Sequence, residues 1–237
     1  MRIEGFLLLA GYTARSQAYV QALARADLDP EYVILFGPEK GNLPGQVSMP
    51  PSNRLPAGIF LPNLSETVKE TCAYRQWNVE KFDVTNVNAN PIYEQLLQIK
   101  PRVIIYSGYG SQLVSPRLLD LGIPFLHIHA GWLPDYKGST TLYYSWLREN
   151  FCAVSAIFLE TRIDGGPILA RQKYLPPPDG IDPDYLYDSA IRADLLVSVL
   201  KDYIREGRFK NVSPQRDSGT EYYVIHPVLK HFARLRK

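Results

Sequence analysis

The sequence has few cysteines and little net charge. Two of its 237 residues are cysteine, Cys72 and Cys152, and they lie far apart without the close spacing that zinc ligands usually show. We expect two reduced thiols in a reducing compartment, with a disulfide as the alternative. The formal net charge of +2 at pH 7 gives no general field that would attract nucleic acid or an anionic membrane surface.

Long hydrophobic runs are also missing. No stretch reaches the roughly 18 apolar residues that a transmembrane helix needs. The apolar start, residues 3–10, could be mistaken for a short signal sequence, but Glu4 and Gly5 interrupt it and no clear cleavage site follows. We interpret it as a first buried strand, and we expect a cytoplasmic protein without a membrane partner.

The nucleotide-binding fingerprint G-x-G-x-x-G is absent after this first strand. The corresponding turn, residues 11–16, ends with Arg15 and Ser16 just before an expected helix. Ser16 could cap that helix, which is the simpler interpretation. Alternatively, Arg15, Ser16 and the free backbone N–H groups of the turn could hold an anion.

Short apolar strands alternate with helical segments along most of the chain. The expected strands are residues 3–10, 30–37, 78–84, 102–106, 124–128, 153–160 and 168–174. The expected helices are residues 17–24, 65–74, 91–99, 116–121, 140–148 and 183–204. This order predicts an α/β fold, a Rossmann-like, mainly parallel sheet with helices on both faces.

The domain organisation follows from the same pattern. We expect one α/β domain over residues 1–205 and a short C-terminal appendage over residues 206–237, which carries Tyr222, Tyr223 and a short basic helix. Residues 38–65 are rich in Gly, Pro, Asn and Ser and are predicted to run over the surface. The sequence leaves a homodimer open.

Two histidines mark the place where one strand runs out into a Gly/Pro loop. His127 and His129 are two positions apart, so on a strand they project from the same face. Asp164 follows the next strand along the chain, and adjacent strand ends can bring such loops into contact. A carboxylate beside a histidine raises its basicity and fixes its tautomer, which suits acid–base chemistry near neutral pH.

Other interpretations of these residues remain open. His-x-His on a strand is also half of a common zinc site, which would need a further ligand from Asp164, His226 or a cysteine. Neither cysteine is close to the motif in the sequence, so we expect no metal. The histidines could also be structural, and Asp164 alone would more often be a turn residue than a catalyst.

The two loops together resemble those of the folate-dependent formyltransferases. The first loop runs from His127 to Gly138 (HIHAGWLPDYKG), and the second runs from Ile163 to Leu169 (IDGGPIL). In that family the first loop usually reads Asn-x-His, then Leu-Pro, then a basic residue and Gly, and the second reads Asp-x-Gly-Pro-Ile. The resemblance covers roughly residues 75–205 and is closest in type to the amino-sugar N-formyltransferases.

The resemblance implies transfer of a formyl group from N10-formyltetrahydrofolate to a primary amine. It implies that His129 stabilises the oxyanion or moves the proton, that Asp164 polarises His129, and that the Leu133-Pro134 bond is cis. The residues expected to hold the folate are Tyr106, Gly108, Tyr109, Gly110, Leu113, Ile163, Gly165, Gly166 and Pro167. The residues expected to contact the amine substrate are Arg15, Ser16, Tyr136, Lys137 and Gly138.

The departure from the family pattern is His127, where the family has Asn. A histidine ring N–H can still donate one hydrogen bond to the formyl oxygen, so His127 is included among the expected catalytic residues. The same departure keeps other functions open: a formyl-folate hydrolase or related acyl transferase, a non-catalytic binding module, or a metal hydrolase.

The acceptor is expected to be a small molecule. Little sequence follows residue 210, where the transfer-RNA members carry a further domain, so we expect no nucleic-acid partner. The turn at residues 11–16 also lacks the Gly-Ser-Asn of the purine-pathway members. Residues 215–227 are similar to the tail of amino-sugar formyltransferases, which favours a nucleotide-linked amino sugar.

Overall fold

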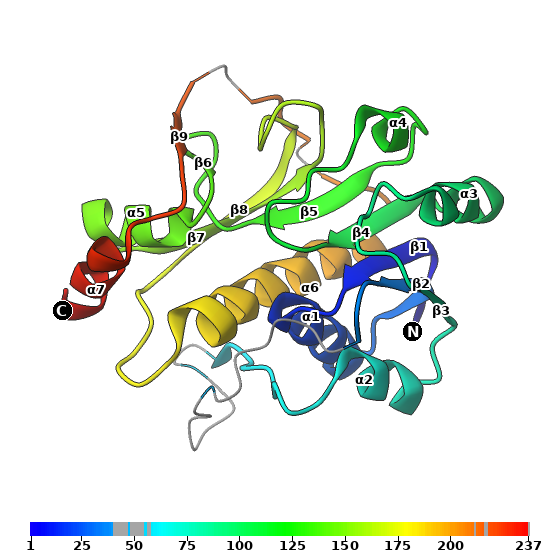
Figure 1. Ribbon diagram of the computed structural model, residues 1–237, viewed down its shortest axis with the longest axis horizontal. Helices are drawn as coiled ribbons and strands as arrows, with labels where there is room; N and C mark the ends of the chain where they lie inside the picture. The colour runs from blue at the N-terminus through cyan, green and yellow to red at the C-terminus, as the bar shows by residue number, and fades with distance from the viewer. Residues whose placement is uncertain (40–46, 48–54, 56–57, 211, 216–217, 237) are drawn as a thin grey trace.

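A seven-stranded sheet with the order β3-β2-β1-β4-β5-β7-β8 forms the centre of the molecule (Figure 1). The computed structural model describes residues 1–39, 47, 55, 58–210, 212–215 and 218–236. The strands of this sheet are β1 (Arg2–Gly11), β2 (Asp29–Phe36), β3 (Val79–Phe82), β4 (Val103–Ser107), β5 (Phe125–His129), β7 (Cys152–Phe158) and β8 (Ile168–Tyr174). The first five strands of the order listed are parallel, whereas β7 and β8 are antiparallel to their neighbours.

Helices cover both faces of the sheet. They are α1 (Ala14–Arg25), α2 (Val68–Tyr74), α3 (Asn90–Ile99), α4 (Pro116–Leu119), α5 (Thr141–Glu149), α6 (Asp188–Glu206) and α7 (Pro227–Leu235). Successive residues of β1 face opposite sides: Leu8 packs in the core beneath α1 and α6, and Leu7 packs in the core beneath α3 and α4 (Figure 1). The predicted Rossmann-like, mainly parallel architecture is confirmed.

The strand order reverses beside β1. From β1 the chain moves outward through β2 and β3 on one side and returns to β4 and β5 on the other. Loops that leave the carboxyl ends of β1 and β4 therefore diverge and open a crevice, which is where open α/β sheets bind ligands. Arg15 at the start of α1 and Ser107 at the end of β4 meet there, since the Arg15 Nε lies 3.3 Å from the Ser107 hydroxyl.

The start of α1 differs from the prediction. The helix begins at Ala14, and the Thr13 hydroxyl caps it by accepting the Ser16 N–H at 3.1 Å. Ser16 is therefore not the cap, because it lies inside the first turn. Both residues are common at helix starts, and the sequence alone does not choose between them. Helix α1 thus begins earlier than the predicted residue 17, whereas the helix predicted at residues 65–74 begins later, at Val68, after a capping box formed by Thr67 and Glu70.

A second, two-stranded sheet was not predicted. It consists of β6 (Tyr136–Gly138), which was expected to be loop, and β9 (Thr220–Tyr222), and the two run parallel. Strands of three residues are too short to show an alternating pattern. The pairing places the chain after α6 beside the loop that follows β5 (Figure 1).

The segment after α6 returns to the main body at several points. Ser213 and Ile168 exchange backbone hydrogen bonds of 2.9 Å, and the Ile225 N–H donates to the Thr140 hydroxyl at 2.8 Å. Helix α7 packs beside α5, and the Lys230 ammonium lies 2.9 Å from the Asp184 carboxylate. The boundary at residues 205 and 206 stays a prediction, and the predicted surface excursion at residues 38–65 falls largely outside the described residues.

Helix α6 is preceded by a π-helical turn at Pro183–Tyr187, so the single helix predicted over residues 183–204 is two consecutive segments. Cys72 and Cys152 are buried free thiols. Within the described ranges, no helix is both long and apolar enough to cross a membrane.

Candidate active site

The His129 imidazole and the Asp164 carboxylate form a buried pair. The Nδ1 atom of His129 lies 3.2 Å from Oδ1 of Asp164, and the two side chains are 6% and 12% exposed. Strand β5 ends at His129, and Asp164 lies in the loop between β7 and β8 with a left-handed φ of 50°. The predicted contact between the two loops is therefore present in the structure.

The Asp164 carboxylate is oriented by a second contact. Its Oδ2 atom accepts the Gly138 N–H at 2.8 Å, so a residue of β6 fixes the carboxylate from the other side. Burial raises the pKa of Asp164, but the His129 ring and the Gly138 N–H outweigh burial, and the pKa is lowered overall. The carboxylate is consequently charged at neutral pH.

Both nitrogens of His129 face acceptors. Besides the contact with Asp164, Nε2 lies 2.8 Å from the Tyr136 carbonyl oxygen. A carbonyl only accepts hydrogen bonds, so Nε2 must carry a proton to bond it. The imidazolium form satisfies both contacts, because both of its nitrogens donate. The two contacts thus hold the ring between the Asp164 carboxylate and the Tyr136 carbonyl.

His127 occupies a different environment from its neighbour two positions on. Its ring is partly buried at 6.1 Å from the Tyr106 ring, and within the described chain its Nδ1 atom has no hydrogen-bond partner. Burial and the nearby guanidinium groups of Arg15 and Arg192 lower the pKa of His127 well below its usual value. His127 is therefore a neutral ring with one free nitrogen at neutral pH.

Two arginines lie next to the histidines. The Arg15 guanidinium donates to the Gly108 carbonyl and lies close to the Ser107 hydroxyl. Arg192 on α6 lies 2.8 Å from the Asp188 carboxylate and donates to the Ile128 carbonyl at 2.7 Å. Since Ile128 is the residue between the two histidines, Arg192 touches the backbone that carries both rings.

These groups line one cavity of about 700 Å³. This volume is typical of small-molecule sites. Of the residues predicted to bind folate or amine, the cavity is lined by Tyr106, Tyr109, Gly110, Leu113, Ile163, Arg15 and Gly138, together with His127, His129 and Asp164. The remaining predicted residues, Gly108, Gly165, Gly166, Pro167, Ser16, Tyr136 and Lys137, are not among those that line it.

The residues outside the cavity wall have structural contacts of their own. Ser16 is fully buried, and its hydroxyl lies 3.1 Å from the Ser107 carbonyl. The Tyr136 ring stacks on Tyr222 at 5.4 Å, its hydroxyl donates to Glu149, and Lys137 is buried. Tyr136 therefore acts on the site through its carbonyl, which contacts His129.

Several lining residues were missed by sequence reasoning. They are Arg192, the tail residues Tyr222, Tyr223 and Val224, and the loop residues Ser139, Thr140 and Glu160. Arg192 carried a signal, because it is a charged residue inside an otherwise apolar helical pattern, four positions after Asp188. The tail resembled that of amino-sugar formyltransferases, but its sequence did not place it at the cavity, because only the pairing of β9 with β6 brings it there.

The loop between the histidines and β6 is fixed by its own contacts. The Leu133-Pro134 bond is cis, as the resemblance implied. The Ser155 hydroxyl donates to the Gly131 carbonyl at 2.6 Å and accepts the Leu133 N–H at 3.1 Å. In the part of the chain that the structure describes, no three His, Cys, Asp or Glu side chains gather closely enough to hold a metal ion.

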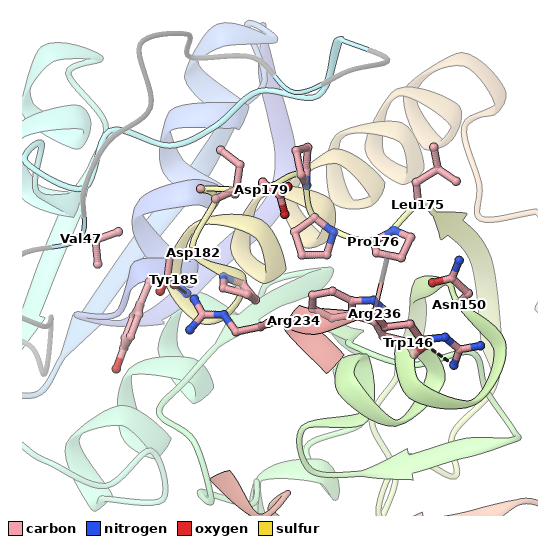
Figure 2. Close-up of a pocket in the computed structure, with 15 residues that line it drawn as sticks. Val47, Trp146, Asn150, Leu175, Pro176, Asp179, Asp182, Tyr185, Arg234 and Arg236 are labelled. Carbon is pink, nitrogen blue, oxygen red and sulfur yellow. Dashed lines mark hydrogen bonds between the residues drawn. The ribbon is translucent and has the colours of Figure 1, made fainter. Parts of the chain in front are cut away.

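A second cavity, of about 880 Å³, lies beside the proline-rich connector between β8 and α6 (Figure 2). Arg236 donates to the Trp146 carbonyl at 3.2 Å at its edge, the contact marked by the dashed line in Figure 2. Asp179, Asp182 and Arg234 also line it. It has no imidazole beside a carboxylate, so the acid–base chemistry belongs to the cavity at the end of β5.

Comparison with known proteins agrees with this geometry. No family model matches the sequence. The chain is 32% identical over 122 residues to a methionyl-tRNA formyltransferase of Finegoldia magna, an alignment that covers 50% of this chain and 39% of that relative. The chain thus spans well under half the length of this curated relative.

Solved structures match over nearly the whole chain. A phosphoribosylglycinamide formyltransferase from Anaplasma phagocytophilum matches with a TM-score of 0.60 and 12% identity, covering 95% of this chain and 98% of that one. A candidate sugar N-formyltransferase from Mycobacterium tuberculosis matches with a TM-score of 0.57 and 17% identity, covering 99% and 87%. At these identities the structures show a shared fold. Sequence similarity over half of the chain and the shared fold over nearly all of it agree with the resemblance to the folate-dependent formyltransferases.

Proposed function

We propose that this protein is an N-formyltransferase that moves a formyl group from N10-formyltetrahydrofolate to a primary amine of a small substrate. The observation that carries the proposal is the buried pair of His129 and Asp164, 3.2 Å apart, in the same cavity wall as the neutral ring of His127. Acyl transfer to an amine needs a donor to the developing oxyanion and a route for the amine proton, and this set contains both.

The cavity wall fits a flat, partly apolar donor. Leu113 and Ile163 line it although they are 62% and 47% exposed, so each presents an apolar surface to an incoming ring. Gly110 leaves open space beside them, since a Cβ there would meet no atom within 4 Å. When bound, the folate would supply the formyl carbon, and Tyr109, Leu113 and Ile163 would hold its ring.

The reacting groups have distinct tasks. The Nε2–H of His129, which bonds the Tyr136 carbonyl in this structure, would turn to the formyl oxygen as negative charge develops there, and Asp164 keeps the ring oriented through Nδ1. The neutral His127 offers its Nδ1 to the same oxygen or to the attacking amine, in the position where the family has Asn. The amine loses a proton during attack, and the leaving nitrogen of the folate gains one, so His129 and His127 lie where that proton must pass.

The acceptor we favour is a nucleotide-linked amino sugar. Tyr222, Tyr223 and Val224 of the tail line the cavity, and Tyr223 is 83% exposed. An exposed aromatic ring at a cavity mouth suits stacking of a base. The fold shared with the candidate sugar N-formyltransferase agrees with this choice. The folate donor and the two buried thiols suit a cytoplasmic setting.

The test is release of tetrahydrofolate from N10-formyltetrahydrofolate with and without a panel of amines. Amine-dependent release, lost in His129→Ala and Asp164→Ala, is the expected result. Release without any amine would instead identify a formyl-folate hydrolase. Absence of formyl-folate binding by calorimetry would identify a binding module that uses the fold for another ligand. Turnover unchanged in both alanine variants would contradict the assignment.

A further inference from the structure

The backbone of the loop that carries Asp164 has an uncommon conformation. Asp164 has a φ of 50°, in the left-handed region that residues other than glycine seldom adopt. Aspartate tolerates this region better than most residues, but such a conformation persists where surrounding contacts hold it. The direction of the carboxylate toward His129 depends on this backbone, because the side chain leaves from the same Cα atom. Contacts to the backbone of the loop therefore decide where the carboxylate lies.

One side chain from the tail bonds two carbonyl groups of this loop. The Nε2 atom of Gln215 donates to the Asp164 carbonyl oxygen at 2.8 Å and to the Gly166 carbonyl oxygen at 2.6 Å. A primary amide nitrogen carries two hydrogens, so both are used. Both partners only accept hydrogen bonds, which means that the nitrogen and not the oxygen of the amide must face the loop.

The loop also rests against the sheet. A Cβ atom at Gly166 would collide with the Phe158 carbonyl, so this glycine lies directly against the end of β7. The Gly165 N–H closes the turn by donating to the Arg162 carbonyl at 3.1 Å. The end of β7 and the Gln215 amide are thus two supports of the loop, and the amide is the one that a single substitution can remove.

Gln215 is itself held in place beside the loop. Two residues earlier, Ser213 exchanges backbone hydrogen bonds of 2.9 Å with Ile168, the first residue of β8. Further along the tail, the Thr220 N–H donates to the Asp135 carbonyl at 3.2 Å, where β9 begins to pair with β6. The bridge between Ser213 and Ile168 therefore anchors the amide to the strand into which the loop runs.

The oxygen of the same amide has no partner. Within the described residues, the Oε1 atom of Gln215 is buried and makes no hydrogen bond. A buried acceptor without a donor costs free energy, which offsets part of the gain from the two Nε2 bonds. The side chain is thus better suited to holding the loop in one position than to adding stability.

Gln215 does not reach the reacting groups. It is not among the residues that line the cavity at the end of β5, and it instead lines a separate cavity of about 510 Å³ beside β8, with Pro134 and Arg171. Its two bonds to the loop are its connection to the candidate active site. Any effect on the reaction must therefore come through the position of Asp164.

We propose that Gln215 is a positioning residue, which fixes the backbone of the Asp164 loop so that the carboxylate stays directed at the His129 ring. The effect on catalysis rests on the proposed formyl transfer, whereas the orientation of the ring does not. Without the amide donors, the carboxylate samples directions in which its 3.2 Å contact with the His129 Nδ1 atom is broken. Binding of the formyl donor changes little, because Gln215 lies outside the cavity wall.

The first test needs no reaction. The sequence has four histidines, so the ring nitrogens of the whole protein can be followed in a long-range proton–nitrogen NMR spectrum, in which His129→Asn assigns one set of resonances. Gln215→Met keeps the length of the side chain and lacks both N–H donors. We expect it to shift the His129 resonances and to leave those of His226 and His231 unchanged. Unchanged His129 resonances would overturn the proposal.

The second test measures release of tetrahydrofolate. Gln215→Met should lower kcat by about tenfold or more with little change in the KM for N10-formyltetrahydrofolate, because a misplaced group acts on the chemical step. Gln215→Lys supplies a donor of similar reach without the unpartnered oxygen, and should restore most of kcat. An equal loss of kcat in the methionine and lysine variants would refute the role of the donors.

Two further variants support these measurements. Gln215→Glu has the same shape and also lacks donors at neutral pH, so it serves both tests if Gln215→Met fails to fold. Gln98→Met is the matched control, since Gln98 is exposed on α3, and it should match the wild type in kcat and in the His129 resonances.

The positioning role and the proposed function fail separately. If Gln215→Met shifts the His129 resonances but the wild type formylates no amine, the positioning role stands and the proposed transferase function is in error. If the wild type formylates an amine while Gln215→Met keeps both its kcat and its His129 resonances, the transferase function stands and the positioning role is refuted.

Discussion

His129 ends strand β5 and Asp164 lies in the loop between β7 and β8, yet the His129 Nδ1 atom lies 3.2 Å from the Asp164 Oδ1 atom. The second nitrogen of His129 is already engaged by the Tyr136 carbonyl at 2.8 Å. The ring therefore keeps its orientation while its exposed edge faces the cavity. The Asp164 carboxylate therefore fixes the direction in which this ring faces.

Asp164→Asn should lower kcat by about 100-fold or more, because a neutral amide holds the His129 Nδ1 atom less firmly than a charged carboxylate does. The substitution keeps the size of the side chain. The melting temperature shows separately whether the variant is folded. Steady-state release of tetrahydrofolate measures the effect. Asp179→Asn, an exposed aspartate at the other cavity, is the matched control and should leave kcat unchanged.

His127→Asn should retain activity, since asparagine also offers one N–H donor to the formyl oxygen. His127→Phe keeps an aromatic ring but no donor, and should lower kcat by about 100-fold. The comparison of kcat between these two variants is the measurement. Equal activity of the phenylalanine variant and the wild type would exclude His127 from the oxyanion contact.

The free energy of unfolding should fall in acid because of the lowered pKa of His127. Its pKa is lowered in the folded protein, so between that value and about 6.5 the unfolded chain binds more protons than the folded one. The contribution is fully present above about pH 6.5 and is lost as the pH falls, by at most about 1.4 kcal/mol per pH unit. Urea unfolding from pH 8 to pH 5 tests this.

The titration of His127 can be isolated from other groups. His127→Asn should flatten the slope of the free energy of unfolding in that range, while His231→Asn, at an exposed position of α7, should not. Asp164 acts in a lower window, because its lowered pKa gives stability that is present above about pH 3.9 and lost below it. A slope that is identical in all three proteins would refute the role of His127.

Gly131→Ala should perturb His129 directly. A Cβ at Gly131 would lie 2.6 Å from the His129 Nε2 atom and would also press on the Tyr136 carbonyl, the two groups that bond each other. We expect a loss of stability on the order of 1–3 kcal/mol together with a lower kcat. Gly110→Ala adds a methyl group into open space and is the stability control. The melting temperatures and kcat values of both variants are the measurement, and equal values for the Gly131→Ala variant and the wild type would contradict the prediction.

The sheet was predictable because its strands are buried on both faces. The predicted strand at residues 102–106 is apolar from Val103 onward and fits a central strand, and the structure has β4 at Val103–Ser107. The start of α1 was less certain, because Thr13 and Ser16 are both residue types that cap the N-terminus of a helix. The strand β6 could not be predicted, since its partner lies more than 80 positions later in the register Tyr136 to Thr220.

The residues of the site that lie at strand ends could be predicted from the sequence. His127, His129 and Asp164 follow strands, and strand ends are fixed by the same pattern that fixes the core. Arg192 and Tyr223 belong to a helix and a tail, whose distance from the histidines depends on tertiary packing. Ser16 and Tyr136 stand beside cavity residues in the sequence, but their side chains point into the core.

The pairing of β6 with β9 has a consequence for the order in which the protein becomes active. The Gly138 N–H that orients Asp164 belongs to β6, and β6 lies beside a strand from the tail. During synthesis the sheet can assemble well before residues 220–222 leave the ribosome. The Asp164 carboxylate therefore gains its final orientation only after the tail has paired with β6, later than the sheet that carries His129.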